Sequence, residues 1–166
     1  MNNKLLQYPP SDFKRQFDIA SPFTGQVIAL SALEDVLVKN VFLGPGAAVS
    51  STSNTVMAPF DGVVLTVCPL DYAVEVKSSA GLRCRIKYGN DTQHLYGAQF
   101  SCSFKQGDKF SIKQPLFTIN SAWLKQQGVA NICIMTVLNA QALQGVMPTQ
   151  RRHVEAAEDT LFSLYL

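Results

Sequence analysis

The sequence predicts an all-β protein with only minor helical elements. Short runs of β-branched and other apolar residues recur along the chain, and glycine, proline or Asp-Gly pairs separate them at the spacing typical of a β-sandwich or barrel. In two runs, Val74 and Val76 alternate with polar residues, as do Phe110 and Ile112, which is the period of strands with one face in water. These patterns leave little of the chain for long helices.

The expected strands fall within eight runs. They are residues 25–30, 41–50, 55–68, 73–79, 82–89, 109–120, 131–139 and 160–166. One short helix is expected in the run "SAWLKQQGV", with Ser121 as its N-cap and Gly128 as its end. Between strands, the pair Asp61-Gly62 is expected to supply the positive φ of a tight reversal. Gly44 and Gly46 are expected to let one backbone pass close to another.

Composition limits the function. The chain has 166 residues, of which 47% are hydrophobic and 16% are charged, enough for one buried core. A net charge of +2, without a long basic run, argues against a nucleic-acid groove. The four cysteines show no C-x-x-C spacing, so we expect reduced, mostly buried thiols and no cofactor. Lacking a secretory signal and a bilayer-spanning apolar run, the sequence predicts a cytoplasmic location.

The sequence divides into an N-terminal arm and one domain. Residues 1–20 are expected to form a flexible arm, and residues 21–166 the domain. Pro9-Pro10 interrupts any amphipathic helix in the arm, and the remaining segment "SDFKRQF" is too short to bind a membrane firmly by itself. We therefore expect no stable membrane insertion.

A series of landmarks gives these elements a specific resemblance. In order, they are "SPFTG", Asp35-Val36, "GPGAAV", "APFDGVV", Gly81, "YGNDT", Leu95-x-Gly97, Phe100, "QGDKF" and Asn139. By their order and spacing, the chain resembles the glucose-type enzyme IIA domain of the bacterial phosphoenolpyruvate sugar phosphotransferase system. The resemblance implies a β-sandwich built as a barrel-like hybrid, with a shallow depression as its active site.

Two active-site histidines of that family are missing here. In the family, one histidine accepts a phosphoryl group from the histidine phosphocarrier protein and passes it to the IIB domain of a sugar permease, while the other stabilises the phosphate. By the resemblance, Lys87 occupies the place of the acceptor and Tyr72 the place of its partner. Imidazole is largely neutral near pH 7 and its phosphorylated form transfers the group onward. An ordinary lysine or tyrosine lacks that combination.

Three functions follow from this substitution. The first is a regulatory protein-binding module that has lost phosphotransfer, with phosphotransferase-system components or a regulated permease or enzyme as its partners. The second is a working phosphocarrier with an unconventional acceptor, so enzyme activity stays open. The third is a zinc peptidase of similar fold, which needs spaced histidines and an aspartate that the sequence lacks.

The resemblance also places binding residues around the depression. They are Arg85, Asp91, Asp35, Val36, Leu37, Val38, Phe42 and His94. The cations Arg85 and Lys87, together with Tyr72, are candidates for an anion niche. The alternative is that Lys87 and Tyr72 alone fill the vacated pocket through packing and one hydrogen bond. The apolar members either form a binding patch or pack under the neighbouring loop.

The remaining polar members carry further alternatives. Asp35 and Asp91 are candidate partners for the two cations, although Asp91 equally suits a turn residue that caps its own backbone. His94 is either an exposed rim residue or a displaced acceptor, with exposure favoured. His153 is expected in a solvated loop, and the two histidines do not suggest a metal site.

Overall fold

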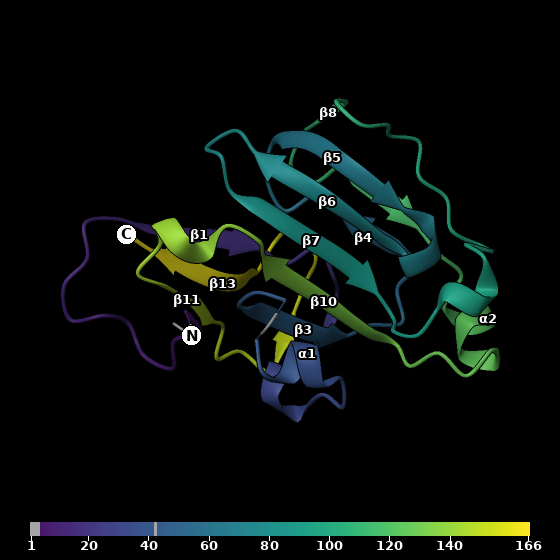
Figure 1. Cartoon of the computed structure of the whole chain (residues 1–166), viewed down its shortest axis with the longest axis horizontal. Coiled ribbons are helices and arrows are strands. Elements are labelled where there is room, and N and C mark those ends of the chain that lie inside the picture. Colours follow the sequence, from purple (N-terminus) through teal and green to yellow (C-terminus); the bar gives the residue numbers. More distant parts are fainter. Residues whose placement is uncertain (1–3, 42) are drawn as a thin grey trace.

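A computed structural model of the chain describes residues 4–41 and 43–166, and its sheets are antiparallel throughout these residues (Figure 1). The largest sheet has eight strands in the order β12-β2-β3-β10-β7-β6-β5-β8. Its members are β2 (Gly25–Ile28), β3 (Gly46–Ser50), β5 (Gly62–Cys68), β6 (Ala73–Ser78), β7 (Arg83–Tyr88), β8 (Lys109–Phe110), β10 (Ile132–Val137) and β12 (His153–Val154). The expected all-β class is thereby confirmed.

Two smaller sheets complete the fold. One has the order β1-β13-β11, with β1 (Gln16–Ala20), β13 (Thr160–Tyr165) and β11 (Gly145–Pro148), and the other pairs β4 (Thr55–Met57) with β9 (Pro115–Thr118). β1 lies inside the segment that the sequence analysis assigned to a flexible arm, and all five of its residues pair with β13. This part of the segment therefore belongs to the sheet.

Helices are few and short, as expected. The α-helices are α1 (Val36–Lys39) and α2 (Ser121–Gln126), and the 3-10 turns are η1 (Leu30–Ala32), η2 (Pro69–Asp71), η3 (Gln93–Leu95) and η4 (Ala140–Ala142). In the described ranges, none of the helices is long and apolar enough to cross a membrane. The prediction of Ser121 as the N-cap of α2 was wrong by one residue. The N-cap is Asn120, whose side chain accepts the hydrogen bond from the Trp123 amide.

The main core lies under the inner face of the large sheet. Val74 and Val76 on β6 are buried there with Cys84 and Ile86 on β7, which confirms the alternation predicted for β6. The second predicted alternation was wrong for Ile112. β8 ends at Phe110, so Ile112 lies beyond the strand and is exposed.

A smaller apolar cluster lies on the opposite face of the same sheet. Val38 and Leu30 pack there on Ala48 of β3 and Ile134 of β10, so that α1 and η1 cover this part of the sheet. Ile134 is also the direct cross-strand neighbour of Lys87. The site described below therefore begins where this apolar cover ends.

Two glycines are required by close backbone contacts. A Cβ on Gly46 would lie 1.9 Å from the carbonyl oxygen of Met135, as expected for a backbone that passes close to another. Gly62 was expected to have a positive φ, but its φ is not positive. Its requirement is instead steric, since its Cβ would lie 2.2 Å from the carbonyl oxygen of Lys77.

Candidate functional site

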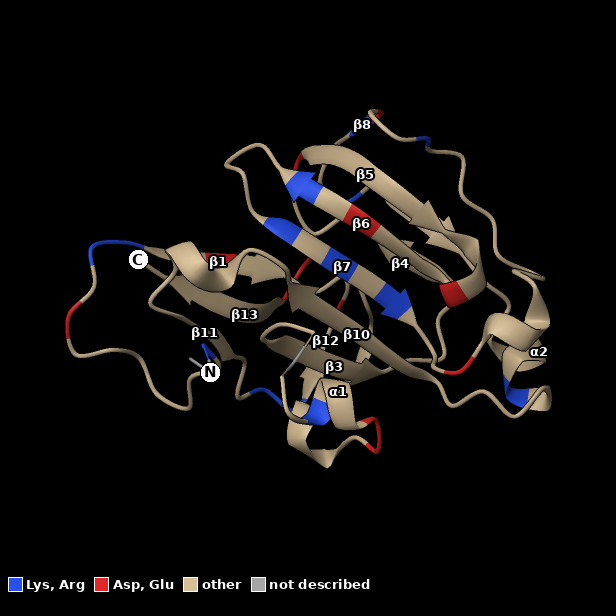
Figure 2. Cartoon of the chain, in the orientation of Figure 1, with Lys and Arg blue, Asp and Glu red and all other residues tan. Residues whose placement is uncertain are grey.

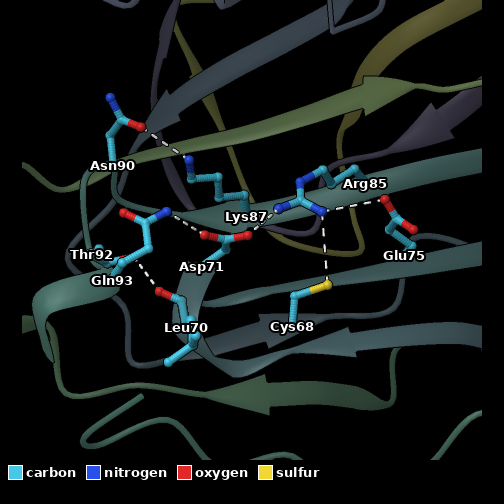
Figure 3. Close-up of polar contacts among 9 residues, drawn as sticks. All are labelled: Cys68, Leu70, Asp71, Glu75, Arg85, Lys87, Asn90, Thr92 and Gln93. Atoms are coloured by element: carbon cyan, nitrogen blue, oxygen red, sulfur yellow. Dashed lines mark hydrogen bonds and ion pairs between the residues drawn. The ribbon is translucent and has the colours of Figure 1, made fainter. Parts of the chain in front are cut away.

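The outer face of the large sheet carries charged side chains in aligned positions. Arg85 on β7 lies directly opposite Glu75 on β6, and Lys87 lies opposite Ala73 at the next outward position. Both cations therefore project from β7 on the same face, near the turns η2 and η3 (Figure 3). The antiparallel register thus sets which side chains meet here.

Arg85 is paired with two carboxylates. Its Nη2 lies 2.9 Å from Oδ2 of Asp71, and its Nη1 lies 3.3 Å from Oε1 of Glu75 and 3.8 Å from Sγ of Cys68. Asp71 also accepts a hydrogen bond of 2.6 Å from Nε2 of Gln93 (Figure 3). The guanidinium is thus engaged within the chain, and the partners considered in the sequence analysis, Asp35 and Asp91, are not the ones it contacts.

Lys87 belongs to a separate chain of hydrogen bonds. Its Nζ donates to Oδ1 of Asn90 at 3.0 Å, and Nδ2 of Asn90 donates to Oδ2 of Asp35 at 3.3 Å. Asp35 is the N-cap of α1, where its Oδ1 accepts from the amides of Leu37 at 2.9 Å and Val38 at 3.4 Å. The side chains of Asn90 and Asp35 therefore connect the end of β7 to the start of α1.

Tyr72 lies in the core behind this face. Its side chain is fully buried, its ring packs edge-on against Phe100 at a centroid distance of 5.9 Å, and its hydroxyl donates to the carbonyl oxygen of Ala98 at 2.6 Å. The backbone is left-handed, with φ 49° and ψ 48°, an uncommon conformation for an aromatic residue. The hydrogen bond considered between Tyr72 and Lys87 is not formed: the Tyr72 hydroxyl donates to Ala98 and the Lys87 ammonium donates to Asn90.

Burial and charge shift the pKa values of these groups. Burial lowers the pKa of Lys87, and Arg85 acts in the same direction, whereas Asp71, Asp35 and Asp91 oppose the shift. Burial also raises the pKa of the Tyr72 phenol. For Arg85, burial lowers the pKa, but Cys68 and Asp71 outweigh it, so the pKa is raised overall. Burial thus disfavours the charged forms of Lys87 and Tyr72, whereas the paired groups around Arg85 favour its charged form.

The other polar residues lie outside this network. Asp91 has a positive φ of 52° and makes no side-chain hydrogen bond or ion pair within the described ranges. His94 is exposed in η3, as favoured by the sequence analysis. His153 was expected in a loop, but it lies on the short strand β12, where its Nε2 is 2.9 Å from Oε1 of Glu155. Across residues 4–41 and 43–166, no group of three or more potential ligands could hold a metal ion.

Apolar side chains are exposed next to the polar network. Val36 is 63% exposed and Leu37 51%, and both follow directly on Asp35, whereas Val38 is buried in the smaller apolar cluster. Leu70, which precedes Asp71, is 49% exposed, and Tyr96, just after η3, is 85% exposed. The predicted residue Phe42 lies outside the described residues. We call Val36, Leu37, Leu70 and Tyr96 the apolar rim.

Sequence reasoning missed the partners of Arg85. Glu75 and Arg85 occupy outward positions on two strands that had been predicted, so their pairing was accessible once a register was assumed. Asp71 gave a weaker signal, because it lies in η2 and reaches Arg85 only through the fold. Asn90, which accepts the hydrogen bond of Lys87, is a further partner that the sequence analysis did not assign.

Comparison with known proteins identifies the class first. The structure matches glucose permease IIA from Mycoplasma capricolum with a TM-score of 0.73 and 22% sequence identity, covering 90% of this chain and 96% of that one. The fold is therefore that of a phosphotransferase-system IIA protein. Residues 17–143 match the family of the phosphoenolpyruvate-dependent sugar phosphotransferase system, EIIA 1, and the chain belongs to this family.

A curated relative supports the same assignment. The chain is 29% identical over 128 residues to the PTS system glucose-specific EIICBA component of Staphylococcus carnosus (strain TM300), covering 76% of this chain. The matched region is 19% of that relative, so this chain corresponds to about one fifth of its length. The resemblance seen in the sequence is thus confirmed at the level of the family.

Proposed function

We propose that this chain is an EIIA-family protein that acts by binding other proteins and does not carry phosphate. The observation behind the proposal is the state of the two family histidine positions. Tyr72 is buried and its hydroxyl donates to the carbonyl oxygen of Ala98, while Lys87 donates to Asn90. Neither position offers an imidazole, and Tyr72 offers no accessible nucleophile.

The charges around Lys87 also disfavour a phosphoryl group. Arg85 is neutralised by Asp71 and Glu75, and Asp35 lies one hydrogen bond beyond Asn90. Two cations therefore face three carboxylates, and an incoming dianion would meet net negative charge. A lowered pKa increases the free-amine fraction of Lys87, but it supplies neither the second phosphate ligand nor a leaving group suited to onward transfer. These contacts favour the interpretation of the site as an ion-pair network within the chain, and not as a binding niche for an anion.

The apolar rim suits a protein partner. Exposed apolar side chains beside polar groups are typical of recognition surfaces, in which the apolar centre supplies affinity and the polar edge fixes orientation. The Asp35 cap accepts hydrogen bonds from the amides of Leu37 and Val38, and Asp35 in turn accepts one from Asn90 of the polar network. We propose phosphotransferase-system components, or a permease or enzyme that they regulate, as partners in the cytoplasm. A phosphocarrier that uses an unconventional acceptor is the alternative that the following experiment tests.

Phosphotransfer is tested with labelled phosphoenolpyruvate, enzyme I and the histidine phosphocarrier protein. We expect no label on this chain, while the IIA region of the Staphylococcus carnosus relative serves as the labelled control. Label that appears on the chain and moves on to a IIB domain would overturn the proposal. A Lys87→Ala variant then shows whether Lys87 is the acceptor.

Protein binding is tested by mutating the apolar rim. We expect a Val36→Asp, Leu37→Asp variant to lose the proteins captured by the wild-type chain from its native cell extract, because charge in the apolar centre of an interface is costly. Ile112→Asp is a matched control, since Ile112 is also exposed but lies away from the polar network. Equal capture by the wild type and the rim variant would contradict the assignment of the surface.

A further inference from the structure

A cavity lies at the opposite end of β6 and β7 from Lys87 and Tyr72. Its volume is about 420 Å³, and it opens between the β6–β7 turn and the three-stranded sheet. Its apolar lining includes Phe17, Ile19, Leu82, Leu143, Leu164 and Leu166. Phe17 and Leu164 are direct cross-strand partners, so both point from the same face of the sheet. This size falls in the range of small-molecule sites, about 300–1,000 Å³.

A polar groove adjoins the cavity. Its volume is about 590 Å³, and it shares Asp61, Ser78 and Ser79 with the apolar cavity. Lys77 and Lys109 line the groove but not the apolar cavity. Asp61 is the only acidic residue in its described lining, and one oxygen of this carboxylate already accepts a hydrogen bond of 2.7 Å from the Ile112 amide. The lining therefore has an excess of positive charge.

The two lysines belong to a row of like charges. Lys77 lies opposite Arg83 on one side and Val63 on the other, and Val63 lies opposite Lys109, so the row crosses β7, β6, β5 and β8. Figure 2 shows this charge as adjacent blue segments at the end of β6 and the start of β7. Like charges directly across strands are destabilising. Within residues 4–41 and 43–166, none of the three cations has an ion-pair partner.

We propose that the cavity and the groove together bind a single-chain amphipathic carboxylate, such as a medium-chain fatty acid. The alkyl chain lies among the apolar side chains of the cavity, where burial removes it from water. The carboxylate lies in the groove, where Lys77 and Lys109 provide the charge complement that the chain itself does not. This site is separate from the polar network and does not depend on the proposed protein-binding function.

The proposal is tested by NMR titration of the full chain with decanoate below its micelle concentration. We expect saturable shifts at the amides of Ser78 and Leu82, and contacts between the ligand and the Leu164 methyl groups. A Lys77→Glu, Lys109→Glu variant should raise the dissociation constant for decanoate by roughly tenfold, since two charge contacts are reversed. Neutral decanol should bind equally to this variant and to the wild type.

Two further variants complete the design. Lys39→Glu, Lys125→Glu makes the same charge change on α1 and α2, away from the groove, and should leave decanoate binding within about twofold of wild type, as expected for screened distant charges. Ala142→Trp should fill the cavity and abolish binding of both ligands, with thermal unfolding used to verify folding. Equal weakening by both lysine pairs, binding of a decyl ammonium ion as tight as decanoate, or binding only to phosphatidylglycerol vesicles would overturn the proposal.

Discussion

Asn90 accepts a hydrogen bond from Lys87 and donates one to Asp35, so one amide side chain joins the end of β7 to the cap of α1. Both distances, 3.0 Å and 3.3 Å, lie within hydrogen-bond range. The exposed residues Val36 and Leu37 follow the cap directly. The hydrogen bonds from Lys87 through Asn90 therefore connect β7 to the residue that caps α1.

Removal of the α1 cap should loosen the apolar rim. We expect Asp35→Ala to lower the free energy of unfolding by about 1 kcal/mol, because two amides at the start of α1 lose their acceptor. Hydrogen exchange at the Leu37 and Val38 amides should rise, and Asn90→Ala should raise it less. Asp91→Asn is the control, since the Asp91 side chain makes no hydrogen bond or ion pair in the described chain and asparagine tolerates its positive φ. Unchanged exchange in Asp35→Ala would contradict the capping role.

The Arg85–Asp71 ion pair should be measurable in a double-mutant cycle. With Arg85→Met and Asp71→Asn, we expect a coupling of about 1 kcal/mol, because both groups are partly shielded from water and stay within 2.9 Å. Urea unfolding at low and high salt provides the measurement, and salt should reduce the coupling. The more exposed pair Lys113–Glu158, at 3.4 Å, is the matched control and should couple less. A larger coupling there would refute the argument from burial.

The hydroxyl of Tyr72 should contribute to stability. Tyr72→Phe leaves the Ala98 carbonyl without its donor, and we expect a loss of about 1–2 kcal/mol in the free energy of unfolding. Tyr96→Phe removes a hydroxyl from the exposed rim and should cost little. Equal stability of the two variants would show that the buried hydrogen bond adds nothing net.

The lowered pKa of Lys87 predicts a specific pH dependence. Between this lowered pKa and the usual value of 10.5, the unfolded chain binds more protons at Lys87 than the folded chain does. The stability of the wild type should therefore rise with pH through that window, relative to Lys87→Met, in which the group is absent. Subtraction of the two unfolding curves cancels the other titrating groups. A falling difference would mean that carboxylate attraction outweighs burial.

Much of the fold could be predicted from the sequence. The strand β6 follows from alternating polar and apolar residues, β7 lies within the expected run 82–89, and the order of turn motifs led to the family that residues 17–143 match. β1, β11, β12 and α1 were not predicted. Their short lengths give too few residues for a periodic pattern. The three strands are stabilised by pairing with distant strands, and α1 by packing of Val38 on the large sheet.

The site was predicted in part. The sequence indicated that Lys87 and Arg85 lie on one face of a strand, because residues two apart in a strand share a face. It did not give the partners of Arg85, since Asp71 and Glu75 lie 14 and 10 residues away. Glu75 meets Arg85 through the register of β6 and β7, and Asp71 through the position of η2.

By itself, the sequence determined the all-β class and the family, because these depend on residue type and spacing along the chain. Only the tertiary structure decided that Tyr72 lies in the core and that Lys87 binds Asn90. The physical reason is that a hydrogen bond is directional and short, so its partner is selected by which segments the fold brings within about 3 Å. Linear spacing does not carry that information for residues on different strands and turns.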